Sequence, residues 1–283
     1  MTGLFNMPKL ADVQREINFY RTPLPNIDSN YIERFTKIFQ VDGKVREPGS
    51  RIVVKDRSGE LEIFVASGSV WWTKRTGRRS ESRRSVKFNS EKRAAANADS
   101  YLEEMELSEK RSKPISVTYT ETVIERKKGE KTIEAVTHQH VNYGFSLDGL
   151  PVWGSGAKIQ ITYGENNQIV EALKFWRETK KERKKLELIS IASAIELFKN
   201  HEYFTDLSEQ TASVHVNEIN LGYYALPPRE TQFFLTPVFQ FIGYVSTENY
   251  ENYDFDNYVL ALAAPADDLK KMGVPITEDS YVI

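Results

Sequence analysis

The chain has 283 residues, of which 40% are hydrophobic and 28% are charged, and it contains no cysteine. This hydrophobic fraction is sufficient for a folded core and excludes a disordered chain, while the lack of cysteine excludes disulfides, zinc–thiolate sites and cysteine nucleophiles. The 38 Lys and Arg residues against 40 Asp and Glu residues give a net charge of -2, which argues against a dedicated nucleic-acid-binding protein.

The sequence predicts no membrane span, because no stretch of about 18 apolar residues is present. The first twenty residues lack a basic region followed by an apolar one, so they do not resemble a signal peptide. Two locations fit these observations. We expect a cytoplasmic protein, or an extracellular or cell-surface protein if a leader has been trimmed from this chain.

Residues 1–112 are predicted to form an N-terminal α+β region. Apolar residues at helical spacing predict an amphipathic helix over 31–39. The turn sequence Asp56–Gly59 lies between two runs rich in β-branched residues and predicts a β-hairpin, which a third strand over 68–73 follows.

The segment 74–93 holds nine basic residues against two acidic ones. It is a candidate site for an anionic polymer, with two tryptophans supplying stacking. The residues that we consider for binding are Trp71, Trp72, Arg78, Arg79, Arg83 and Arg84. The alternative is a solvated loop between a strand and a helix, with the tryptophans in the core of a sheet.

A helix over 90–105 is predicted from a Ser N-cap and apolar residues spaced three and four apart. Residues 113–178 are then predicted to form a strand-rich region with two further hairpins, which turn at 127–130 and 164–167. His138 and His140 face one side of a strand and could share a metal ion, but two ligands do not make a site, so a polar sheet face is the favoured interpretation.

Residues 179–283 are predicted to begin with a charged connector over 179–185, followed by a helix over 190–199 and by strands over 213–221, 233–244 and 258–264. The segment 248–258 is acidic and rich in tyrosine, as recognition loops often are. Its candidate binding residues are Tyr250, Tyr253, Asp254, Phe255 and Asp256. An exposed hairpin loop without a partner is the alternative. Helices alternating with antiparallel hairpins predict an α+β fold of two units, each with a helix packed on a curved antiparallel sheet, after an irregular N-terminal region.

Parts of this order resemble known modules. Residues 149–154 read G-L-P-V-W-G, similar to the G-x-P-V-x-G turn of secreted metalloprotease propeptides. The helix start at Ser190 and the segment L-T-P-V-F-Q-F over 235–241 resemble the helix and the L-x-P-V-x-x-F strand of the PepSY module. The order over about residues 90–264 is also similar to that of YycH/YycI-type extracellular regulators of a bacterial sensor kinase. The resemblance implies an exported, non-catalytic protein that binds or inhibits a partner.

The sequence contains no nucleophile elbow, phosphate-binding loop or set of metal ligands at a known spacing. We therefore expect a non-enzymatic binding or regulatory protein of the cell exterior, without a cofactor or metal, whose partner is another protein or a second copy of the chain. One alternative is an enzyme that uses carboxylates or tyrosines in a sheet concavity. Another is a self-assembling surface or filament subunit.

Overall fold

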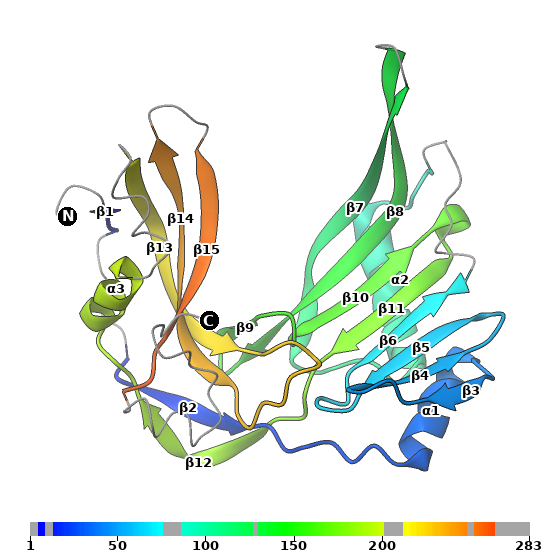
Figure 1. The fold of residues 1–283 in the computed structure, drawn as a ribbon, viewed down its shortest axis with the longest axis horizontal. Coiled ribbons are helices and arrows are strands. Elements are labelled where there is room, and N and C mark those ends of the chain that lie inside the picture. The colour runs from blue at the N-terminus through cyan, green and yellow to red at the C-terminus, as the bar shows by residue number, and fades with distance from the viewer. Residues whose placement is uncertain are drawn as a thin grey trace. The chain divides into compact units, whose positions relative to one another are not determined.

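A computed structural model of the chain describes residues 5–8, 14–75, 86–126, 130–200, 212–247 and 252–263, with backbone alone for 122–126, 130–134 and 212 (Figure 1). These residues form an α+β fold with three α-helices, a large, mostly antiparallel sheet and a two-stranded sheet, which confirms the predicted class. The chain divides into two compact units. The large unit comprises Leu24–Glu178 and Leu226–Thr231, and the small unit comprises Met1–Pro23, Thr179–Ala225 and Gln232–Ile283.

The large unit contains two helices, a 3-10 turn over Glu165–Asn167 and nine strands among its described residues. The helices are α1 (Ser29–Phe39) and α2 (Glu91–Glu104). The strands are β3 (Lys44–Arg46), β4 (Arg51–Lys55), β5 (Gly59–Phe64), β6 (Val70–Lys74), β7 (Ser112–Arg126), β8 (Glu130–Leu147), β9 (Leu150–Trp153), β10 (Lys158–Tyr163) and β11 (Ile169–Phe175). They pair antiparallel in the order β9-β8-β10-β11-β6-β5-β4-β3, and β7 pairs with β8 (Figure 1).

Both helices of the large unit pack on one face of its sheet. The Phe39 ring of α1 stacks on Trp72 of β6, with ring centroids 5.3 Å apart. The Tyr143 hydroxyl of β8 donates a hydrogen bond of 2.8 Å to Asp99 of α2. Apolar residues that alternate along the strands, such as Val141, are fully buried beneath these helices. The core of this unit therefore lies between the helices and one face of the sheet.

The small unit contains α3 (Ile191–Lys199) and two sheets. Its strands are β1 (Phe5–Asn6), β2 (Glu16–Arg21), β12 (Lys180–Glu187), β13 (Ala212–Tyr224), β14 (Thr236–Thr247) and β15 (Tyr253–Leu260). The strands β13, β14 and β15 form an antiparallel meander, and β1 joins β13 in parallel. The Phe198 ring of α3 stacks on Phe241 of β14 at 4.3 Å and lies 5.6 Å from the Phe255 ring. These rings form the centre of the small unit's core.

Local sequence explains where these elements start and turn. Asp28 and Ser190 cap α1 and α3 by accepting hydrogen bonds from the Tyr31 and Ser193 backbone N–H groups. Ser90 precedes α2 as predicted, but its side chain makes no capping hydrogen bond. Between β8 and β9, Asp148 and Gly149 have φ angles of 51° and 83°, the left-handed region that suits an Asp-Gly hairpin turn.

Two expectations about the C-terminal half were wrong. The predicted charged connector over 179–185 is instead largely part of β12 (Lys180–Glu187), which pairs antiparallel with β2. This two-stranded sheet escaped prediction because β12 is almost entirely charged and buries only Leu186. The last strand lies at 253–260 rather than 258–264, so most of the predicted tyrosine-rich loop belongs to β15. The sequence-based boundaries 1–112, 113–178 and 179–283 stay a prediction.

Candidate binding surface

The face of the large unit's sheet that points away from α1 and α2 carries many polar side chains, with the apolar Leu173 and Val53 among them. On β8, Val141 and Tyr143 point towards the helices, so His138, His140 and Asn142 point the other way. The strand register places Thr162 and Gln160 of β10 directly beside His140 and Asn142. We call this surface the polar face. Its members are Thr118, Thr120, His138, His140, Asn142, Lys158, Gln160, Thr162, Glu171, Trp71, Thr73, Glu60, Glu62, Arg51 and Lys55.

The neutral half of the polar face is a hydrogen-bonded network across β7, β8 and β10. His140 Nε2 lies 2.7 Å from the Thr120 hydroxyl, and its Nδ1 lies 3.0 Å from the Thr162 hydroxyl. Asn142 donates to Thr118 at 3.0 Å and accepts from Gln160 at 2.6 Å. Cross-strand contacts of this kind hold each side chain in one orientation, which prepares it for a ligand.

Electrostatics keep the centre of this network uncharged. Burial lowers the pKa of His140, and electrostatic interactions with the neighbouring His138 and Lys158 lower it further. A His pKa below its usual value of about 6.5 leaves the imidazole neutral at pH 7. At this pH the ring therefore joins two hydroxyls as one donor and one acceptor.

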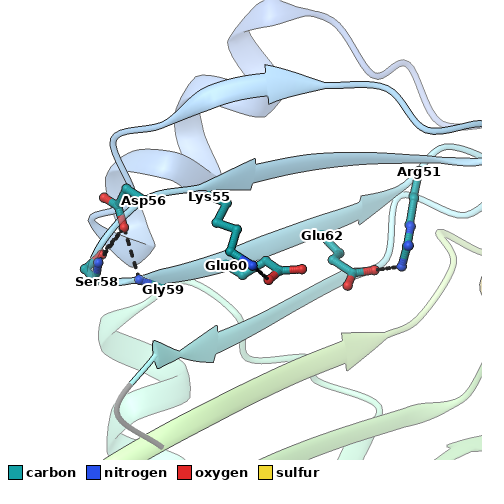
Figure 2. Close-up of polar contacts among 7 residues, drawn as sticks. All are labelled: Arg51, Lys55, Asp56, Ser58, Gly59, Glu60 and Glu62. Carbon is teal, nitrogen blue, oxygen red and sulfur yellow. Dashed lines mark hydrogen bonds and ion pairs between the residues drawn. The ribbon is translucent and has the colours of Figure 1, made fainter. Parts of the chain in front are cut away.

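The charged half lies on β4, β5, β6 and β11. Arg51 pairs with Glu62 at 2.6 Å, and Lys55 pairs with Glu60 at 2.8 Å, as Figure 2 shows along the β4–β5 hairpin. The Glu62 side chain is only 8% exposed. Beside this hairpin, Trp71 donates its indole N–H to Glu171 at 2.6 Å. This half therefore carries charges of both signs, and each of its two cations forms an ion pair with a neighbouring glutamate.

The polar face contains one of the residues predicted for binding. Trp71 lies on it, whereas Trp72, next along the strand, points to the helices and stacks on Phe39. Arg78, Arg79, Arg83 and Arg84 lie outside the described residues, as does Tyr250.

The other predicted residues lie on β15 in the small unit, where strand alternation separates them. Phe255 is buried against Phe198, and Asp254 and Asp256 are exposed on the opposite side. Tyr253 is half-buried and pairs with Val245 in the strand register. These residues do not form one surface, because successive residues of a strand face opposite ways.

The histidine pair faces one side, as predicted, with ring centroids 6.2 Å apart. In the described part of the chain, no group of three or more His, Cys, Asp or Glu side chains is arranged to hold a metal ion. Sequence reasoning missed Gln160, Thr162 and Glu171 as members of this surface. Their signal was the alternation of polar and apolar residues over 158–163 and 169–175, which marks a sheet face but not what it contacts.

No protein-family model and no curated protein matches the chain. Among solved structures, the chain is similar to an uncharacterized protein from Eubacterium rectale ATCC 33656, with a TM-score of 0.49 and 11% identity over 89% of this chain and 85% of that one. Within the described residues, no helix combines the length and the apolar character needed to cross a membrane.

Proposed function

We propose that the protein is a non-enzymatic binding or regulatory protein that contacts another protein through the polar face of its large unit. The observation that supports this is the order of that face. Its polar groups from seven neighbouring strands are held by hydrogen bonds and ion pairs to one another, while most of them, other than the buried Thr162, Thr73 and Glu62, remain partly accessible. A surface prepared in this way loses little side-chain entropy when a partner binds.

The composition of the polar face favours a protein as the partner over a polyanion. Arg51 and Lys55 are each matched by a glutamate, and Glu171 adds a third carboxylate, so the face has no positive excess to attract phosphates. Trp71 and Arg51 belong to residue types that are enriched among the residues contributing most energy at protein interfaces. Amide groups that remain partly accessible, such as that of Gln160, supply donors and acceptors that suit peptide groups.

In this proposal the protein acts outside the cell or at its surface, in line with the resemblance to PepSY modules and to YycH/YycI-type regulators. The basic segment 74–93 and the acidic tyrosine-rich segment stay candidate contacts for an anionic polymer or for a second copy of the chain.

Site-specific photo-crosslinking in the source organism tests this proposal. A photoreactive residue in place of Lys158, which is exposed on the polar face, is expected to give one discrete protein adduct. The same residue in place of Lys37, exposed on α1, is the matched control and is expected to give none.

A second substitution ties the adduct to the polar face. Trp71→Ala in the Lys158 background is expected to lower the adduct yield by about fivefold, the effect of roughly 1 kcal/mol of lost binding energy. Equal adducts at positions 158 and 37, or an adduct that Trp71→Ala leaves unchanged in a folded chain, would contradict a partner on this face.

A further inference from the structure

The two-residue strand β1 occupies one edge of β13 in the small unit. β14 pairs with β13 along its other edge, and β1 pairs in parallel at Phe5↔Val214 and Asn6↔His215. These partners lie more than 200 residues apart in the sequence, so no hairpin holds β1 in place. Parallel pairs are also slightly less stable per residue than antiparallel ones.

Each residue of β1 has its own place on β13. The Phe5 ring lies edge-on to Phe198 with centroids 6.2 Å apart, on the core side of the sheet where Phe198 stacks on Phe241. Asn6 points the other way, and its Nδ2 lies 3.2 Å from Nδ1 of His215, whose ring stacks on Tyr244. This edge of β13 therefore places an aromatic contact, Phe198, on one side of an added strand and a hydrogen-bonding imidazole, His215, on the other.

This combination is how sheets recognise extended peptides. Backbone hydrogen bonds to an open edge supply affinity, and places for alternate side chains supply specificity. Within the part of the chain that the structure describes, β1 contributes only two residues to this pairing. A longer strand that also places an aromatic residue against Phe198 would form more backbone hydrogen bonds with the same edge.

We propose that the β13 edge at Val214 and His215 is a strand-accepting site for an extended peptide segment of a partner protein. The segment carries an aromatic residue followed by a hydrogen-bonding residue, and β1 is the chain's own competitor for the site. We infer these two residue types in the partner segment from Phe5 and Asn6, the residues of β1 that occupy the site in this structure. This site lies in the small unit and is independent of the polar face, so either proposal can fail alone.

The test measures binding of a fluorescent peptide to the whole chain. The probe has the sequence of residues 2–8, and Phe5→Ala in the chain weakens the competitor without changing β13. The probe is expected to bind the F5A chain about tenfold more tightly than the unchanged chain, because the site is open for a larger fraction of the time. A probe with alanine in place of its phenylalanine is expected to lose at least about tenfold in affinity for the F5A chain.

Hydrogen exchange provides a second measurement and checks that the variant folds. Amides near Val214 are expected to lose protection in the F5A chain and to regain it with the probe, while amides of β4 and β5 stay unchanged. Equal affinity for both chains, or equal binding of the alanine probe, would overturn the proposal. A concentration-dependent dimer that F5A abolishes would also overturn it, in favour of exchange of β1 between copies.

Discussion

At the scale of single residues, Arg177 is the side chain whose role is hardest to foresee and simplest to test. It is 3% exposed, and its guanidinium donates hydrogen bonds of 2.6–2.7 Å to the backbone carbonyls of Leu226, Pro227 and Glu230. Burial lowers its pKa to about 10, which still leaves it a cation at neutral pH. One side chain therefore attaches residues 226–231 to the remainder of the large unit.

We expect Arg177→Met to lower the free energy of unfolding by about 3 kcal/mol, because one buried and two part-buried carbonyls lose their donor. Chemical denaturation at neutral pH measures this. Arg34→Met is the matched control: its ion pair with Glu106 is exposed on both sides, so the expected loss stays below about 1 kcal/mol. Equal losses for the two variants would show that the three carbonyls find other donors.

The Asp56 carboxylate organises the turn between β4 and β5. It accepts hydrogen bonds from the Ser58 hydroxyl and from the backbone N–H groups of Asp42, Ser58 and Gly59, and Figure 2 shows its contacts with Ser58 and Gly59. These donors, the Ser58 side chain first, lower the pKa of Asp56 from 3.8 to about 2. Its carboxylate thus prefers the folded state.

Asp56 should make stability pH-dependent in a defined window. Because its folded pKa lies below its unfolded pKa, its contribution is complete above pH 3.8 and is lost as the pH falls towards 2. We expect Asp56→Ala to reduce stability by about 1 kcal/mol at pH 6, as loss of a capping carboxylate does, and by less at pH 2.5. Urea titrations at both pH values check this, with the exposed Asp254→Ala as control. A deficit that grows at low pH would contradict the assignment.

At the scale of elements, two ion pairs on the β4–β5 hairpin form an internal comparison (Figure 2). Arg51 faces a glutamate that is 8% exposed, whereas Lys55 faces one that is 17% exposed and is itself 61% exposed. Arg51→Met leaves the carboxylate of Glu62 nearly buried without its cation, and we expect a loss of about 2 kcal/mol.

Lys55→Met on the same strand is expected to change stability by less than about 1 kcal/mol, because its pair is better hydrated. Thermal or chemical unfolding of the two variants in low and high salt measures the difference. Salt should affect the Lys55 pair more than the Arg51 pair, because screening acts mainly on exposed charges. A larger loss from Lys55→Met would contradict the burial argument.

Most elements were predictable because their local signals are strong. The helices at 31–39, 90–105 and 190–199 follow apolar spacing, and the hairpin at Asp56–Gly59 follows its turn sequence. β12 was missed because a charged edge strand has the composition of a linker until a partner such as β2 is known. The polar face could not be predicted from local sequence for the same reason. Trp71 and Trp72 were proposed together as binding residues, and only the sheet register shows that they lie on opposite faces.

At the scale of the whole molecule, neither unit is a continuous piece of chain. The small unit combines β2, from before Pro23, with β12, from after Thr179. The large unit recruits Leu226–Thr231 to Arg177. Composition suggests a domain boundary at position 178/179. A cut there would separate β2 from β12 in the small unit, and Arg177 from residues 226–231 in the large unit.

We expect the protein to stay associated when it is cut at an engineered protease site after Glu178. The fragments 1–178 and 179–283 should co-elute in size-exclusion chromatography under native conditions and separate only in denaturant. Expressed alone, fragment 1–178 should be less stable than the Arg177→Met variant, because it lacks residues 226–231 altogether. Fragments that separate readily and fold alone would show that these shared segments contribute little.

The sequence by itself determined the α+β class, the three helices, the main hairpins and the lack of any cysteine chemistry, because each of these depends on residues close together in the chain. Only the tertiary structure decided which side chains share the polar face, that Arg177 holds residues 226–231, and that β1 lies on β13. These are contacts between residues tens to hundreds of positions apart, and their partners are fixed by strand register and burial rather than by local pattern.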